Sequence, residues 1–145
     1  MPEFICLTSF ASHLRQDSDG PTSVLTLGGL NPEYYTGDFT YVDLTASDRW
    51  QFEIERLQLS NGDVLMSESG RQAVVDSSTS LIVGPMEEVA ILNRKLGAKP
   101  LPGQVRMFEF DCSELDSLPD IEFFENGQKL ALSSKDYVSK VFLKG

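Results

Sequence analysis

The 145-residue chain is acidic, with 12 basic and 22 acidic residues, a formal net charge of −10 and a pI near 4.4. This charge disfavours nucleic acids and anionic membrane surfaces as partners. With 41% hydrophobic residues the chain is long enough to bury a core, so we expect one globular domain over residues 1–145. Its apolar runs fall well short of the roughly 20 residues that cross a bilayer, so we expect no membrane-spanning segment.

Much of the chain alternates between apolar and polar residues with a period of two, which predicts strands. The clearest such segments are residues 10–14, 23–27, 39–44, 50–59 and 121–124. Asn61-Gly62 and Asn126-Gly127 follow the last two segments, and Asn-Gly is the dipeptide most favoured in tight hairpin turns. The sequence therefore predicts a mostly β fold with at least two hairpins.

One substantial helix is predicted over residues 85–96. Pro85 stands at the expected first helical position, two glutamates follow in the first turn, two basic residues occupy the last turn, and Gly97 ends the helix. We expect its buried side to carry Met86, Val89, Ala90 and Leu96. A short helical turn is also expected near residues 133–137.

The most informative segment is residues 72–85, where an apolar strand leads into Asp76, four hydroxyl-bearing residues and a second apolar run. A carboxylate at the end of a buried strand is costly unless it receives hydrogen bonds. The hydroxyl groups that could donate them belong to Ser77, Ser78, Thr79 and Ser80. We therefore expect Asp76 to be a functional carboxylate held in a hydroxyl-rich turn.

The other chemically interesting residues give weaker patterns. His13 is the only histidine, and its place in a predicted strand favours a partly exposed structural role over a catalytic triad. Asp17 and Asp19 lack the regular spacing of calcium ligands. Cys6 and Cys112 lack metal-ligand spacing and could pair with each other, pair outside the chain or stay free. We expect neither a metal site nor a cofactor.

The Asp76 loop resembles the second Asp-Thr-Gly-Thr-Ser active-site loop of the pepsin-like aspartic peptidases, with Ser78 in place of the glycine. Further motifs resemble the same family in the same order: Leu25-Thr26-Leu27-Gly28-Gly29, Tyr34-Tyr35-Thr36-Gly37, Trp50-Gln51-Phe52 and Leu118-Pro119-Asp120-Ile121. The similarity extends over nearly all of residues 10–141. It implies that the chain is the C-terminal lobe of such a peptidase, a β-rich lobe with one main helix.

The resemblance also implies that parts of the enzyme lie outside this chain. The family's first lobe carries its own catalytic Asp and a substrate-covering flap, and the C-terminal lobe ends in a Leu-Gly-Asp strand that we expect beyond residue 145. Ser67 and Arg71 occupy positions where the family has a disulfide. The usual partner of Cys112 would lie further downstream, so Cys112 is expected to be free unless Cys6 reaches it.

In this family two Asp residues, one from each lobe, share a proton and activate a water for attack on a peptide bond. Asp76 would be one of the two, so the 145-residue chain alone is expected to be inactive. The second Asp would come from the N-terminal lobe of the same protease or from a second copy of this chain. The implied ligands are a peptide substrate or a pepstatin-like inhibitor, and the implied setting is secreted, lysosomal or vacuolar.

Ser78 leaves an alternative open. The family's glycine lets the backbone approach the carboxylates closely. A side chain there would crowd the site, and a positive φ would add strain of about 1–2 kcal/mol. The alternative is therefore a catalytically inactive protease-fold binding protein, and a third option is a β-rich interaction domain. In each case the exposed apolar face of a lone lobe predicts a dimer or a two-chain complex.

Overall fold

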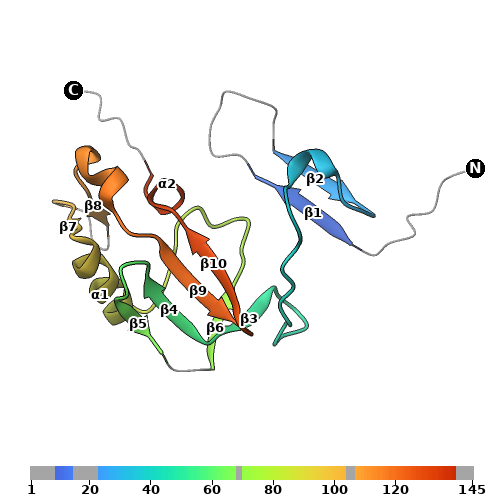
Figure 1. Cartoon of the computed structure of the whole chain (residues 1–145), viewed down its shortest axis with the longest axis horizontal. Coiled ribbons are helices and arrows are strands. Elements are labelled where there is room, and N and C mark those ends of the chain that lie inside the picture. Colours follow the sequence, from blue (N-terminus) through green and yellow to red (C-terminus); the bar gives the residue numbers. More distant parts are fainter. Residues whose placement is uncertain (1–8, 15–22, 68–69, 104–106, 140–145) are drawn as a thin grey trace, which may run out of the picture. The chain divides into compact units, whose positions relative to one another are not determined.

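The computed structural model describes residues 9–14, 23–67, 70–103 and 107–139. The chain forms two compact units, residues 1–39 and residues 40–145, which we describe separately. The organisation of the chain as a single domain stays a prediction. Both units are built mainly from antiparallel strands, and the expectation of a mostly β fold with one main helix is confirmed (Figure 1).

The described residues of the first unit form one pair of antiparallel strands. β1 (Phe10–His13) pairs with β2 (Val24–Leu27) over its whole length. The backbone N–H of Gly28 donates to the carbonyl of Ser9 at 2.8 Å and extends the ladder by one bond. Gly28 has a φ of 77°, which a residue without a Cβ adopts freely. Both strands were predicted from their alternation.

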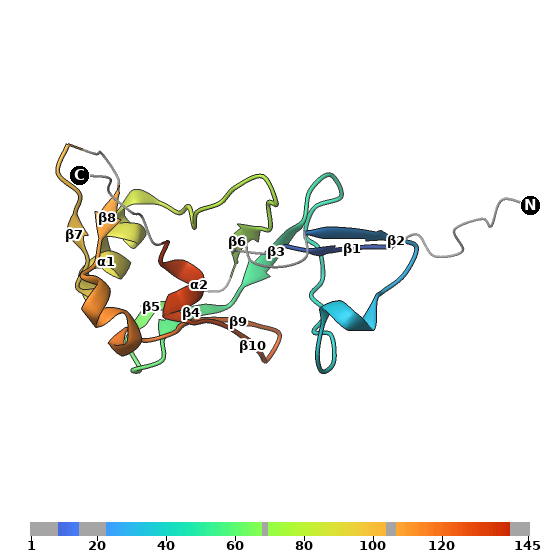
Figure 2. The same ribbon diagram turned by 90° about the horizontal axis from the view of Figure 1, so that it is seen from above.

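The second unit is centred on a four-stranded antiparallel sheet with the order β10-β9-β4-β5 (Figures 1 and 2). The four strands are β4 (Arg56–Leu59), β5 (Val64–Met66), β9 (Ile121–Glu125) and β10 (Gln128–Leu132). β9 is therefore an inner strand, although it lies more than 60 residues after its neighbour β4 in the sequence.

Both predicted hairpins form. Gly62 lies in the connection between β4 and β5 with a φ of 94°. Asn126 and Gly127 connect β9 to β10 with φ values of 47° and 73°. Two successive left-handed residues twist a two-residue loop in the same sense as the strands it joins. The Asn-Gly dipeptides thus determine where this sheet folds back on itself.

Two predicted strands were wrong in detail. The expected long strand over residues 50–59 is divided at Glu55 into β3 (Gln51–Ile54) and β4, because β3 pairs with β6 (Arg71–Val74) while β4 pairs with β5 and β9. Residues 39–44, all described, form no strand. Alternation shows that a segment could pair in a sheet, but a strand also needs a neighbouring backbone, and these six residues are in no ladder.

The main helix, α1 (Met86–Leu96), begins one residue later than predicted. Pro85 is its N-cap, with the extended ψ of 140° that precedes a helix. Gly97 ends it in the left-handed conformation with a φ of 79°, as expected. Leu96 is buried and Val89 and Ala90 are half-buried, but Met86 is 67% exposed because it lies in the first turn, beyond the packed part of the helix.

The remaining elements are short. They are β7 (Lys99–Pro100) paired with β8 (Phe108–Glu109), the 3-10 helices η1 (Pro32–Tyr34) and η2 (Cys112–Ser117), and α2 (Ser134–Tyr137). The last of these is the helical turn predicted near residues 133–137. In the described part of the chain no helix is both long and apolar enough to cross a membrane.

The core of the second unit lies between α1 and the central sheet. Leu59, Leu96 and Ile121 form its buried centre, and seven partly buried side chains pack around them. Tyr137 joins this core from α2 and donates its hydroxyl to the carbonyl oxygen of Pro119 at 2.7 Å. Burial raises the pKa of Tyr137 to about 12. This contact holds α2 against the segment that leads into β9.

Candidate active site

The candidate site begins where β6 ends. Val74 is the last residue of β6 and lies opposite Gln51 of β3. The N–H of Val75 then donates to the carbonyl of Trp50 at 3.0 Å, which continues the pairing by one residue. Asp76 follows immediately, so the β3–β6 ladder fixes the backbone from which its carboxylate projects.

The Asp76 carboxylate accepts three hydrogen bonds from the next turn. Ser78 donates both its backbone N–H and its hydroxyl to Oδ1, at 2.9 Å and 2.7 Å. Thr79 donates its hydroxyl to Oδ2 at 2.7 Å. Both carboxylate oxygens are therefore occupied by donors, as the hydroxyl-rich sequence predicts. Ser77 and Ser80 make no hydrogen bond to Asp76 within the described part of the chain, so two of the four expected donors do not contribute.

These hydrogen bonds lower the pKa of the Asp76 carboxyl. The largest cause is the Ser78 hydroxyl, followed by the Thr79 hydroxyl and the Ser78 backbone N–H, while desolvation has a smaller opposing effect. Donors directed at a carboxylate stabilise its charged form. No charged side chain is among the causes, so the turn alone accounts for the shift.

Ser78 fits this turn without backbone strain. Asn126 is the only non-glycine residue with a positive φ in the described ranges, so Ser78 does not adopt the left-handed conformation considered from the sequence. The N–H of Thr79 donates to the carbonyl of Asp76 at 3.2 Å and closes a tight turn around Ser78. The expected strain of about 1–2 kcal/mol therefore does not arise.

The expectation of a buried strand before Asp76 was wrong. Val74 and Val75 are exposed, Val75 by 64%, and the apolar run after the loop, residues 81–83, is exposed as well. Among the described residues β6 pairs with β3 alone, and these two strands form a separate two-stranded sheet. The apolar pattern marks residues suited to burial, but the described part of this chain provides nothing that covers them.

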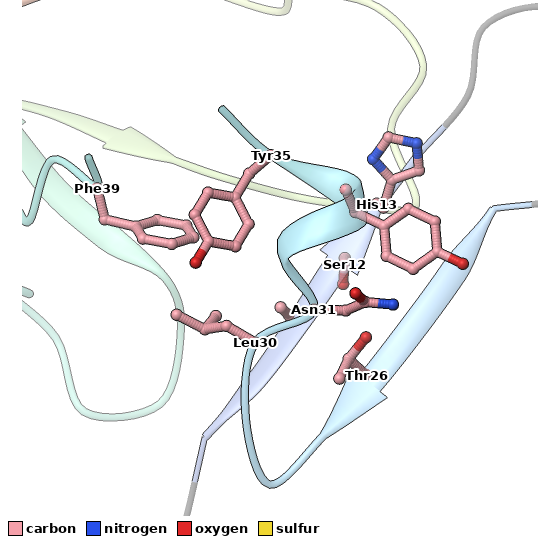
Figure 3. A pocket seen from close by; sticks show the side chains of 9 residues that line it. Ser12, His13, Thr26, Leu30, Asn31, Tyr35 and Phe39 are labelled. Carbon is pink, nitrogen blue, oxygen red and sulfur yellow. The ribbon is translucent and has the colours of Figure 1, made fainter. Parts of the chain in front are cut away.

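The first unit contains a small hollow of about 70 Å³, drawn in Figure 3. Tyr35 and Phe39 lie at one end with their ring centroids 4.5 Å apart, and His13 lies at the other (Figure 3). The His13 ring stacks on Tyr34 at 5.0 Å. His13 is half-buried, and its imidazole is engaged by an aromatic ring, which agrees with the structural role expected for it.

Of the remaining sequence candidates, the structure describes Cys112. Cys112 is an exposed free thiol at the start of η2. Cys6, Asp17 and Asp19 lie outside the described residues. Within residues 9–14, 23–67, 70–103 and 107–139, no three acidic, histidine or cysteine side chains come together as a metal site.

Sequence reasoning missed one useful feature, a second copy of the Asp–Ser contact. Ser113 donates its N–H and its hydroxyl to Oδ1 of Asp111 at 2.9 Å and 2.7 Å, the same distances as at Asp76. Asp111 caps η2, and the pKa of its carboxyl is lowered chiefly by the Ser113 hydroxyl. The Asp-x-Ser spacing shared by both turns could have revealed it.

The family model of the eukaryotic aspartyl proteases matches residues 3–145. The chain belongs to this family. Three relatives illustrate the similarity: cathepsin D of Gallus gallus is 37% identical over 94% of this chain, cathepsin D of Chionodraco hamatus is 40% identical over 94%, and chymosin of Ovis aries is 36% identical over 86%.

The chain spans about a third of the length of these relatives, between 32% and 34% of each. Most of the length of these relatives therefore lies outside the segment that this chain matches.

Proposed function

We propose that this chain is the C-terminal lobe of an aspartic endopeptidase and that Asp76 is one carboxylate of its catalytic dyad. The observation that carries the proposal is the triply hydrogen-bonded Asp76 carboxylate at the end of β6, in a loop that resembles the family's second active-site loop. Family membership over residues 3–145 supports the reaction class.

In the proposed reaction, a water lies between Asp76 and a carboxyl group of the first lobe. The ionised carboxylate takes a proton from the water as the water oxygen bonds to the peptide carbonyl carbon, and the protonated carboxyl donates to the carbonyl oxygen. The intermediate then breaks its C–N bond as the first carboxyl gives its proton to the departing nitrogen and the second takes a proton back from a hydroxyl group, which leaves an acid and an amine. Since one carboxylate cannot fill both roles, the isolated chain is inactive.

The partner that completes the site is the N-terminal lobe of the same protease. The exposed apolar residues on both sides of the Asp76 loop support this choice, since they occur where a covering surface is needed. Pairing with a second copy of this chain would also bring two carboxylates together and is the alternative assembly. By family, we propose a lysosomal, vacuolar or secreted setting.

The experiment measures cleavage of a quenched fluorogenic peptide at acid and neutral pH. We expect no cleavage by the chain alone, and acid-dependent, pepstatin-sensitive cleavage when a first lobe is joined to it. Asp76→Asn and Asp76→Ala should abolish this cleavage. Asp111→Asn is the matched control, because Asp111 has the same serine contact but caps η2. Cleavage that survives Asp76→Asn would refute the proposal.

The second candidate function is a catalytically inactive protease-fold protein that binds peptides. One observation favours it: the Ser78 hydroxyl lies 2.7 Å from Oδ1 of Asp76, on the carboxylate that would bind the catalytic water. In that case the two-lobe protein binds a pepstatin-like inhibitor or peptide, binding survives Asp76→Ala, and Ser78→Gly raises activity. If Ser78→Gly leaves an inactive two-lobe protein inactive, Ser78 is not the cause.

A further inference from the structure

The Ser78 side chain makes a contact that a glycine could not make. Glycine at this position could donate only its backbone N–H to Asp76, whereas Ser78 adds a hydroxyl donor to the same carboxylate oxygen, at 2.7 Å. A donor at this distance from a charged oxygen makes a strong, charge-assisted hydrogen bond. The substitution thus adds a third donor to the two from the Ser78 N–H and the Thr79 hydroxyl.

The turn at Asp111 shows what this contact does elsewhere in the chain. There the same geometry caps a 3-10 helix, and Ser113 is itself part of that helix. No helix begins at Asp76: the next one, α1, starts at Met86. The capping hydrogen bond at Asp111 comes from the Ser113 backbone N–H, and the Ser113 hydroxyl adds a second donor to the same oxygen. Among the described residues, the acceptor of the Ser78 hydroxyl is the Asp76 carboxylate, outside any helix.

We propose that Ser78 is a positioning residue that holds Asp76 in its ionised form, so that in the assembled dyad Asp76 is the base and the opposing carboxyl carries the shared proton. The dyad part of this inference rests on the proposed function. The effect on Asp76 itself does not, because all three donors belong to this chain.

The assignment follows from how two coupled carboxyl groups share one proton. The proton resides on the group whose charged form is less stabilised, and the apparent pKa values belong to the pair. Three donors on Asp76 disfavour its protonation, so the proton passes to the other carboxyl. Asp76 then accepts a proton from water as the water oxygen attacks, and the other carboxyl gives its proton to the carbonyl oxygen.

This arrangement has a chemical cost and a consequence for pH dependence. A carboxylate stabilised by three donors is a weaker base, so each proton transfer from water has less driving force. It also stays ionised at lower pH, so activity persists further into acid. Removing the hydroxyl should move the acid limb of the kcat/KM profile to higher pH, which a purely structural change would not do.

The test is a ¹³C-detected NMR titration of the aspartate side-chain carboxyl groups in the 145-residue chain. Ser78→Ala should raise the pKa of Asp76, and Ser78→Thr, which keeps the hydroxyl, should leave it near the wild-type value. Ser113→Ala is the matched control: it should raise the pKa of Asp111 and leave Asp76 unchanged. An unchanged Asp76 pKa in Ser78→Ala, or an equal rise in Ser113→Ala, would overturn the proposal.

The two-lobe protein then tests the assignment of the base. There Ser78→Ala should shift the acid limb of kcat/KM to higher pH, with Ser78→Thr restoring the wild-type profile. An unmoved acid limb with a raised Asp76 pKa would overturn the assignment of Asp76 as the base. If Asp76→Asn does not affect cleavage, the proposed function fails while the titration result for Ser78 stands.

Discussion

The Lys129 ammonium group lies 2.9 Å from the Glu122 carboxylate, and the two residues come from the paired strands β10 and β9. Gln58 of the neighbouring β4 donates its side-chain amide to the other carboxylate oxygen at 2.7 Å. Glu122 is buried to 7% exposure, so this charged group is held within the central sheet by two specific partners. Such an arrangement connects the stability of the sheet to pH.

We expect Glu122→Gln to weaken the dependence of stability on acid pH. The hydrogen bond from Lys129 and then that from Gln58 lower the pKa of the Glu122 carboxyl. Since its folded pKa lies below the unfolded one, its stabilisation is present above the unfolded pKa and is lost as pH falls through the folded pKa. The measurement is the thermal melting temperature of the wild type and of Glu122→Gln at a series of pH values from neutral to acid.

Glu125, in the same strand, provides the matched control with the opposite sign. Desolvation, followed by the nearby charges of Glu55, Glu53 and Asp43, raises the pKa of its carboxyl. Its stabilisation is therefore present below the unfolded pKa and is lost as pH rises through the folded pKa. Glu125→Gln should stabilise the protein at neutral pH. If Glu122→Gln and Glu125→Gln change the pH dependence of stability in the same direction, the opposite effects assigned to these two carboxyl groups are wrong.

We expect Leu59→Ala to destabilise the chain by about 2–5 kcal/mol, because Leu59 is fully buried at the centre of the core and its removal leaves a cavity. Leu130→Ala is the control on the edge strand β10, where the side chain is exposed, and it should cost about 0.5 kcal/mol or less. Urea unfolding followed by circular dichroism measures both. Equal losses would show that the core is not centred on Leu59.

We expect Gly127→Ala to destabilise the β9–β10 hairpin by about 1–2 kcal/mol, because Gly127 has a φ of 73° that is costly for a residue with a Cβ. No atom lies within 4 Å of the added Cβ, so the backbone conformation alone causes the loss. Gly29→Ala is the control, since Gly29 has equally open surroundings without a positive φ. Chemical unfolding that shows no difference between the two variants contradicts this reading.

We expect the isolated chain to self-associate through the apolar run after the Asp76 loop, residues 81–83, where Val83 is 79% exposed. Ile82→Asp should shift the protein toward the monomer, because a charge in an apolar contact is poorly tolerated. Leu130→Asp, at an exposed position in β10, should not. Light scattering over a range of protein concentrations measures the self-association. A wild-type chain that is monomeric at every concentration would contradict the prediction.

The parts of the fold set by local sequence were predictable. The Asn-Gly turns, the glycine at the end of α1 and the short α2 were read correctly, since each depends on a few adjacent residues and their backbone preferences. The donors to Asp76 were predictable as a group for the same reason. Which two of the four hydroxyl residues would donate was not, because it depends on the exact path of the turn.

What failed were predictions that depend on distant partners. Residues 39–44 have the alternation of a strand, but no described strand pairs with them. β6 has the composition of a buried strand but only one paired neighbour in the described ranges. The sequence pattern records which surfaces are suited to burial. It contains no information on whether the covering surface belongs to the same chain, and here the relatives are about three times as long.

Since Ser78 lies outside the left-handed region, position 78 places no demand on the backbone that only glycine could meet. Ser78→Ala and Ser78→Thr can therefore be compared with the wild type without left-handed backbone strain in either variant. If Asp76 acts as proposed, position 78 is a single side chain through which the acidity of one catalytic carboxyl group could be tuned.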